Sequence, residues 1–255
     1  MKFSVDTLRN TVGIVVAVLA VASVAYYGFF AVPSIRRSSA KLSIVERVID
    51  ESGPGYSITG SYPEITEGMN AAAFNTYITG IVQNEEDDFK QNLSEVAVAG
   101  GTSTLTVQGT VVATSTDFVS VLLYADNFLV GMAHPSHTMV SVNFDLSRGR
   151  NIALGDLFVP GADYLNVIAD YAASDIADQV KNGTYFSTPE YITQSGGLAA
   201  DSANFEVFNI TMHALILHFQ EYQVGPYASG PATTTIPWNA LSFVMSPVSP
   251  LLHLF

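Results

Sequence analysis

The chain of 255 residues contains no cysteine, which excludes disulfide bonds, thiolate metal sites and an anchor through a lipid-modified cysteine. Basic residues are also few: ten Lys and Arg stand against 23 Asp and Glu, a formal net charge of −13. Half of the basic residues but only one acidic residue precede position 42, so residues 42–255 carry a net charge of −17. Such a domain repels nucleic acid and attracts cationic partners, although acidity also simply keeps an exported domain soluble.

The common signatures of catalysis and cofactor binding are missing too. The sequence has no Gly-x-Ser-x-Gly nucleophile turn, no phosphate-binding loop and no Rossmann glycine pattern. We therefore expect no cofactor and no enzyme. A cell-wall hydrolase stays as an alternative, because the two carboxylates that glycoside hydrolysis requires have no recognisable spacing.

One histidine pair hints at a metal site. His134 and His137 are three residues apart, and in an extended segment such residues point to opposite faces, with no third ligand at a recognisable spacing. We expect no metal here, and we expect His134 to bond to the backbone where a strand begins.

Residues 11–32 form an uncharged, apolar run long enough to cross a bilayer of about 30 Å as a helix. A cleaved signal peptide is the alternative, but its apolar region is usually only about 7–15 residues long. Basic residues on the two sides nearly balance, so charge alone does not orient the segment. Residues 33–55 are polar, are broken by Gly53-Pro54-Gly55, and predict a juxtamembrane stalk.

Strand patterns dominate the remainder of the chain. Residues 140–146 alternate apolar side chains with Ser141, Asn143 and Asp145, which is typical of a strand with one buried and one wet face. Residues 102–115 and 118–124 predict a hairpin, and residues 205–210, 213–222 and 233–236 predict further strands.

Helical spacing recurs twice, over Met69–Leu93 and over Asp163–Lys181, where Asn182-Gly183 supplies a C-terminal cap. The fold class is therefore α+β. We expect a mainly antiparallel sheet of about five to seven strands, with both long helices packed on one of its faces.

The turn at residues 221–230 has the composition of a recognition loop, since it combines an acid with rigid amphipathic rings. We take Glu221, Tyr222 and Tyr227 as possible partner-binding residues, together with Asp126 at the break after residues 118–124. Core packing of Tyr222 and a structural role for Tyr227 are the alternatives.

Several spaced segments resemble one bacterial family. They are Gly131-Met-Ala-His-Pro135, Asn143-Phe-Asp-Leu146, Ile152-Ala-Leu-Gly-Asp-Leu-Phe158, and residues 219–230 followed by Ile236-Pro237. Together they resemble a domain of unknown function found outside the membrane in lysozyme-sensing anti-sigma factors and ahead of the catalytic domain in some peptidoglycan deacetylases. About ten residues precede the apolar run, so we expect neither a sigma-binding nor a deacetylase domain.

The resemblance implies an extracytoplasmic domain of a single-pass membrane protein. We expect a cytoplasmic N-terminus (1–10), an anchor (11–32), a stalk (33–55), an α+β domain in two modules (56–100 and 101–245) and an apolar tail (246–255). Its expected partner is a cationic, lysozyme-like protein or a cell-wall glycan, with no nucleic acid. A structural envelope protein that assembles with other membrane proteins is the alternative.

Overall fold

The computed structural model describes residues 41–96 and 100–247. The described residues belong to one compact unit. The expected anchor at 11–32 and most of the apolar tail, residues 248–255, lie outside the described residues. In the described part of the chain, no helix is both long and apolar enough to span a membrane.

Six strands form the first sheet, and their order across the sheet is their order along the chain. They are β1 (Ser43–Gly53), β2 (Tyr56–Glu67), β3 (Ser103–Ser115), β4 (Phe118–Phe128), β5 (Ser136–Asp145) and β6 (Arg150–Asn151). Neighbours are antiparallel except β2 and β3, which are parallel and connected by helix α2 (Ala71–Val96). A parallel pair needs such a crossover, because a tight turn cannot return the chain to the same end of the sheet.

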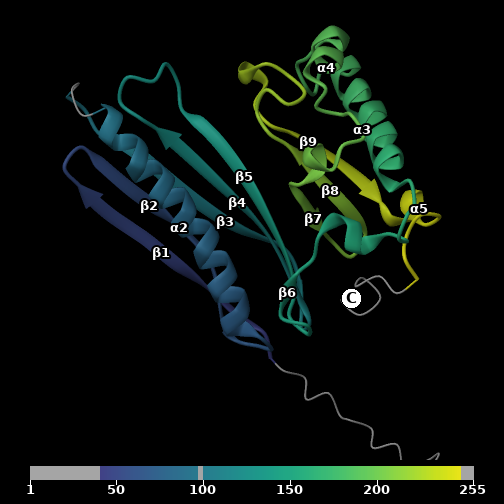
Figure 1. Cartoon of the computed structure of the whole chain (residues 1–255), viewed down its shortest axis with the longest axis horizontal. Helices are drawn as coiled ribbons and strands as arrows, with labels where there is room; N and C mark the ends of the chain where they lie inside the picture. Colours follow the sequence, from purple (N-terminus) through teal and green to yellow (C-terminus); the bar gives the residue numbers. More distant parts are fainter. Residues whose placement is uncertain (1–40, 97–99, 248–255) are drawn as a thin grey trace, which may run out of the picture. The chain divides into compact units, whose positions relative to one another are not determined.

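A second sheet holds three short antiparallel strands, β7 (Phe208–Ile210), β8 (Ala214–Phe219) and β9 (Ala232–Pro237). The helices around it are α3 (Tyr164–Lys181), α4 (Pro189–Ser195) and α5 (Trp238–Leu241). Single 3-10 turns are η1 (Leu154–Leu157), η2 (Ser202–Phe205) and η3 (Tyr227–Ser229). Figure 1 shows α2 along the first sheet and α3 along the second.

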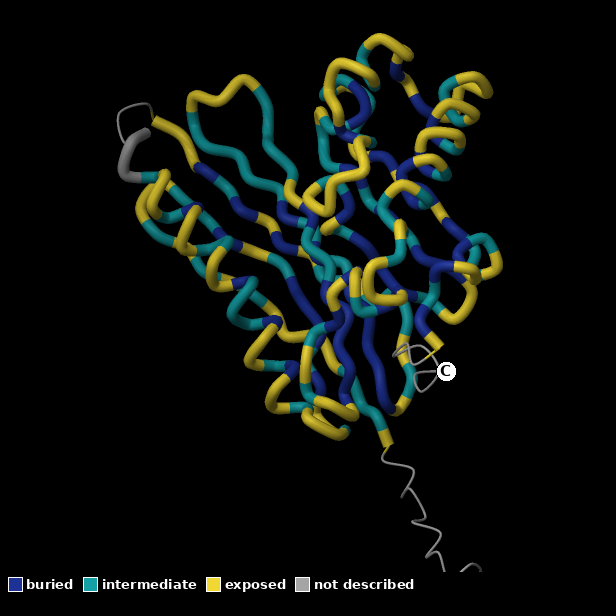
Figure 2. Tube along the Cα trace, turned by 45° about the vertical axis from the view of Figure 1, so that its right-hand side comes forward, coloured by how far each residue is buried: buried dark blue, intermediate teal, exposed yellow. Residues whose placement is uncertain are grey.

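The α+β class is confirmed, whereas one sheet carrying both long helices is wrong. Helix α2 closes the core of the first sheet with Phe74 and Ile78, while Ile168 and Ile176 of α3 belong to the core of the second. Strands β7 to β9 pair only with one another, so they need a helix of their own to bury their apolar face. In Figure 2 the buried residues follow the strands of both sheets.

Two expected boundaries need correction. Residues 43–53, assigned to the stalk, form edge strand β1, which pairs with β2 along its whole length because Ile44 and Ile49 pack against the first core. The expected division at residue 100 also falls inside the first sheet, which continues to Asn151. The crossover through α2 ties β3 to β2, so the chain passes to the second sheet only after β6.

The polar face of β5 is not wet. Asn143 is only 1% exposed and Asp145 only 1% exposed, although both alternate with apolar residues. Asn143 is covered by β7, while Asp145 is enclosed by the turn after β5, where its carboxylate accepts bonds from Ser147 Oγ and Arg148 N. The alternation of β5 therefore marks two covered faces, one apolar and one polar.

Asn143 joins the two sheets by binding the backbone of β7. Its Nδ2 donates to the carbonyl of Phe208 at 2.7 Å, and its Oδ1 accepts from the N–H of Ile210 at 2.9 Å. Ser120 Oγ donates to the same oxygen at 2.8 Å. The amide thus supplies β7 with the donor and acceptor that a neighbouring strand would otherwise provide.

Two other amides bind backbone in the same two-bond manner. Gln220 Oε1 accepts from Met139 N at 3.0 Å while its Nε2 donates to Met139 O at 2.8 Å, so the end of β8 is fixed to β5. Asn75 of α2 does the same to Ile65 of β2, at 2.8 and 2.9 Å. Each pair of hydrogen bonds fixes both the distance between the two elements and their relative orientation.

A series of buried hydrogen bonds connects Asn143 with His218. Asn209 Nδ2 donates to Ser120 Oγ at 2.8 Å, so Asn209 Oδ1 is the acceptor for His218 Nε2 at 2.9 Å. His218 therefore carries a hydrogen on Nε2. Burial lowers the pKa of His218 from 6.5 to about 4.

We predict that Asn143→Ala destabilises the fold strongly, because it leaves the buried carbonyl of Phe208 and N–H of Ile210 without partners. Urea denaturation should show a loss of about 3 kcal/mol or more, since each unsatisfied buried group costs about 1–3 kcal/mol. Asn166→Ala, which removes a bond between exposed side chains on α3, should cost about 0.5 kcal/mol or less. Equal losses in the two variants would contradict the role assigned to Asn143.

We also predict that His218 makes the fold less stable in acid. Below pH 6.5 the unfolded chain binds a proton at this ring that the folded protein does not bind until about pH 4, so stability falls as the pH falls through this window. Between pH 7.5 and 4.5 the ring should account for about 2–3 kcal/mol.

Urea denaturation over this pH range tests the point with His218→Gln, whose amide still donates to Asn209. This variant should lose less stability in acid than the wild type, whereas His213→Gln, at an exposed position, should keep the wild-type pH dependence. If His218→Gln matched the wild type at every pH, the assignment would be wrong.

Candidate functional site

The tip of the β4–β5 hairpin meets the turn after β8 in a cluster centred on His137. His137 Nδ1 bonds to Glu221 Oε1, and His137 Nε2 lies 3.5 Å from Asp126 Oδ2. Glu221 has a side chain only 9% exposed, whereas that of Asp126 is 44% exposed. We call this the His137 cluster; its residues are Tyr124, Asp126, His134, His137, Glu221, Tyr222 and Tyr227.

Strand register places the first half of the cluster. Asp126 on β4 is directly opposite His137 on β5, so their side chains share a face of the sheet. Tyr124 lies two residues before Asp126 on that same face, and its ring stacks on His137 with centroids 5.4 Å apart. The polar alternation at the end of these two strands therefore builds a site.

The turn after β8 supplies the second half. Gln220 is fixed to Met139 of β5, which brings the next residue, Glu221, to His137. Tyr222 follows with φ +65°, a left-handed conformation that is uncommon for a tyrosine, and Tyr191 donates a hydrogen bond to its carbonyl at 3.0 Å. A strained residue beside a titratable pair is typical of functional sites.

The aromatic rings form a row across the cluster. The ring centroid of Tyr227 lies 6.1 Å from that of His137 and 5.8 Å from that of Tyr222. His134 packs against Tyr227, the middle ring of the row, with a distance of 3.8 Å between the two ring centroids. Tyr227 also donates to the carbonyl of Pro135 at 3.0 Å, which ties the turn to the start of β5.

The carboxylates make the site electronegative. Desolvation, followed by the charges of Glu221 and Asp126, raises the pKa of Tyr124. The pKa of Tyr227 is raised in the same way, by desolvation first and then by Glu221. Both hydroxyl groups therefore stay protonated at neutral pH and act as hydrogen-bond donors.

The structure brings all four predicted residues, Asp126, Glu221, Tyr222 and Tyr227, into this cluster. Tyr222 is 52% exposed, so the alternative that it packs in the core is wrong, while the bond from Tyr227 to Pro135 agrees with a structural role. His134 bonds to a backbone carbonyl through Nδ1, that of Pro135 at 2.8 Å, as predicted.

Sequence reasoning missed His137, the residue at the centre. It was considered only as a metal ligand, although its register opposite Asp126 already follows from the hairpin. In the part of the chain that the structure describes, no group of three or more His, Asp or Glu side chains is arranged to hold a metal ion.

Part of the chain is similar to a known protein family. Residues 155–239 match the family described as "Protein of unknown function (DUF3298)", which confirms the expected domain of unknown function. A solved DUF3298 structure from Bacteroides fragilis covers 85% of this chain and 98% of its own, with a TM-score of 0.62 at 15% identity. One from Pseudomonas aeruginosa covers 82% and 96%, with a TM-score of 0.58 at 13% identity. These structures share the fold.

A named relative corrects the expectation that the protein is not an enzyme. The chain is 30% identical over 112 residues to esterase Rv3036c of Mycobacterium tuberculosis, a segment that covers 44% of this chain and 46% of the esterase. The chain thus spans about half the length of this curated relative. That relative is named an esterase, whereas the expectation of no enzyme rested only on the absence of familiar nucleophile motifs from this sequence.

Proposed function

We propose that this chain, with its match to DUF3298, hydrolyses carboxylic esters and that His137 is its proton-transfer residue. One observation carries the proposal: the imidazole is held at Nδ1 by the buried carboxylate of Glu221, while Nε2 faces the more exposed side of the cluster. A carboxylate that fixes one ring nitrogen and leaves the other for the reacting group is a recurring arrangement in hydrolases. The similarity to an esterase supports the same reaction class.

In this mechanism a water molecule attacks the ester carbonyl. His137 Nε2 takes a proton from the water as its oxygen bonds to the carbonyl carbon, and then returns the proton to the departing alcohol oxygen. Glu221 orients the ring and stabilises it while it carries the extra proton. Asp126, at 3.5 Å from Nε2, is too distant for a strong hydrogen bond and serves to orient the water.

We also propose that the domain acts outside the cytoplasm, held to the membrane by residues 11–32. The charge distribution supports this, because an uncharged run precedes a domain of net charge −17. An anchored hydrolase of this kind would act on esters of the cell envelope.

The esterase proposal predicts that His137→Gln lowers kcat/KM for a p-nitrophenyl ester by about 100- to 10,000-fold, the usual contribution of a general acid–base residue. Glu221→Gln keeps an acceptor for Nδ1 but removes the charge, so it should lower kcat with little change in KM. His213→Gln, at an exposed histidine outside the cluster, is the matched control and should keep full activity. Wild-type hydrolysis that survives in His137→Gln would contradict the proposal.

A second role, binding a cationic protein such as lysozyme, is favoured by the acidic charge and by the exposed ring of Tyr222. Such binding should be measurable by calorimetry at low ionic strength and should weaken steeply as salt is added. Tyr222→Asn, which tolerates the left-handed backbone, should weaken it, whereas Phe243→Asn, at another exposed ring, should not. Absence of binding at low salt would remove this role.

A further inference from the structure

A groove of about 630 Å³ lies between the first turns of α2 and the β5–β6 hairpin, away from the His137 cluster. His137 lies near one end of β5 and Phe144, which lines the groove, near the other. The lining residues are Ala72, Ala73, Thr76, Tyr77, Phe144, Gly149, Arg150 and Asn151. A volume of this size falls within the usual range for small-molecule sites, about 300–1,000 Å³.

The walls of the groove are apolar and aromatic. Phe144 is 2% exposed and packs against Phe74, with ring centroids 5.6 Å apart, and against Tyr77, at 5.9 Å. Tyr77 itself is 40% exposed, which leaves part of a large ring uncovered. Ala72 and Ala73 are exposed on the facing turn of α2, and their small side chains leave the space open.

Asn70 holds the start of α2 against the β5–β6 hairpin, next to the groove. Its Nδ2 donates to the carbonyl of Leu146 at 2.6 Å, which fixes the start of α2 to the hairpin. Gly149 has φ +66°, and a Cβ there would come within 3.1 Å of Asn70 Cγ, so a side chain at this turn would disturb the contact. The groove is therefore formed before any ligand arrives.

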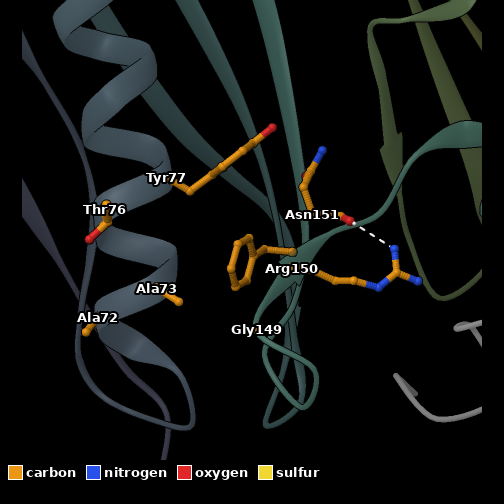
Figure 3. A pocket seen from close by; sticks show the side chains of 8 residues that line it. Ala72, Ala73, Thr76, Tyr77, Gly149, Arg150 and Asn151 are labelled. Carbon is orange, nitrogen blue, oxygen red and sulfur yellow. Dashed lines mark hydrogen bonds between the residues drawn. The ribbon is translucent and has the colours of Figure 1, made fainter.

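Two polar groups of the lining can meet a ligand, the Tyr77 hydroxyl from α2 and the Asn151 amide from the hairpin. Tyr77 extends from α2 across the groove toward Asn151 (Figure 3). Burial raises the pKa of Tyr77, so its hydroxyl stays a donor. Asn151 Oδ1 already accepts from Asn143 N at 3.0 Å, and the Nδ2 end of this amide is a second donor.

Charge is largely absent from the lining. Arg150 is the one charged residue among those that line the groove, and its guanidinium reaches away from α2 (Figure 3), with Nη1 2.7 Å from Asp156 Oδ2. The lining offers no carboxylate to a cation, and a domain of net charge −17 disfavours an anion, so the groove suits an uncharged ligand.

We propose that this groove is a binding site for an uncharged, largely apolar small molecule that carries a carbonyl or ester oxygen. The ring or chain of the ligand lies against Tyr77 and the two alanines, over the buried ring of Phe144. Its oxygen accepts hydrogen bonds from the Tyr77 hydroxyl and the Asn151 amide. The site is separate from the proposed ester hydrolysis and does not depend on it.

The neutral fluorescent ketone prodan tests the proposal with the full chain. Its emission should shift to the blue and saturate at one molecule per chain. Ala73→Leu fills the groove and should weaken binding by about tenfold or more. Ala173→Leu, the same change at an exposed position on α3, is the matched control and should bind like the wild type.

Tyr77→Phe separates the polar contact from the apolar one. It should weaken prodan binding by about three- to tenfold, the value of one hydrogen bond, and leave binding of dimethylaminonaphthalene, which lacks the ketone, unchanged. Thermal unfolding of each variant checks that the fold is kept. Equal affinity of Ala73→Leu and Ala173→Leu for prodan, or tighter binding of the anionic probe anilinonaphthalene sulfonate than of prodan, would overturn the proposal.

Discussion

The pairing of side-chain amides with backbone is the constraint on which the arrangement of the two sheets depends. Asn143 occupies the place of a neighbouring strand for β7, and Gln220 does the same for Met139 at the far end of β5. Apolar packing is tolerant of small shifts, whereas two hydrogen bonds to one backbone segment allow a single register. The second sheet is therefore fixed along β5 at two points.

The His137 cluster is a direct consequence of this register. Glu221 follows Gln220, so the bonds that align β8 with β5 also bring a buried carboxylate to the imidazole. The donor chain from His218 to Asn143 runs in one direction only, which fixes the orientation of every amide along it. The buried hydrogen bonds thus position the His137 cluster at the surface of the protein.

Periodicity in the sequence located the elements well, because each helix and strand reflects contacts over short separations. The helix expected at Met69–Leu93 is Ala71–Val96, and the one expected at Asp163–Lys181 is Tyr164–Lys181. Four residues of the cluster stand out in the sequence, since an acid beside rigid rings in a turn has the composition of a recognition loop; their role in binding stays a prediction. The strand expected over 205–210 is partly wrong, because η2 occupies its start.

The alternation of apolar and polar residues does not show what covers the polar face of a strand. Asn143 was assigned to a wet face because alternation alone cannot tell water from another sheet. The contact between His137 and Glu221 spans 84 residues, and nothing local to either residue specifies it. Hydrogen bonds between amides far apart in the chain leave no periodic pattern in the sequence. For the same reason, the sequence pattern predicts one sheet where the structure has two.

The polar residues of β5 that face the second sheet also affect folding during synthesis. During synthesis the six-stranded sheet and its helix are complete once the chain has reached Asn151, well before β7 emerges. The face that β7 later covers carries Ser120, Ser141 and Asn143, which water solvates readily, beside the apolar side chains of Phe118 and Met139. The polar groups keep part of this face hydrated until β7 is synthesised, which reduces the apolar surface through which an incomplete chain could aggregate.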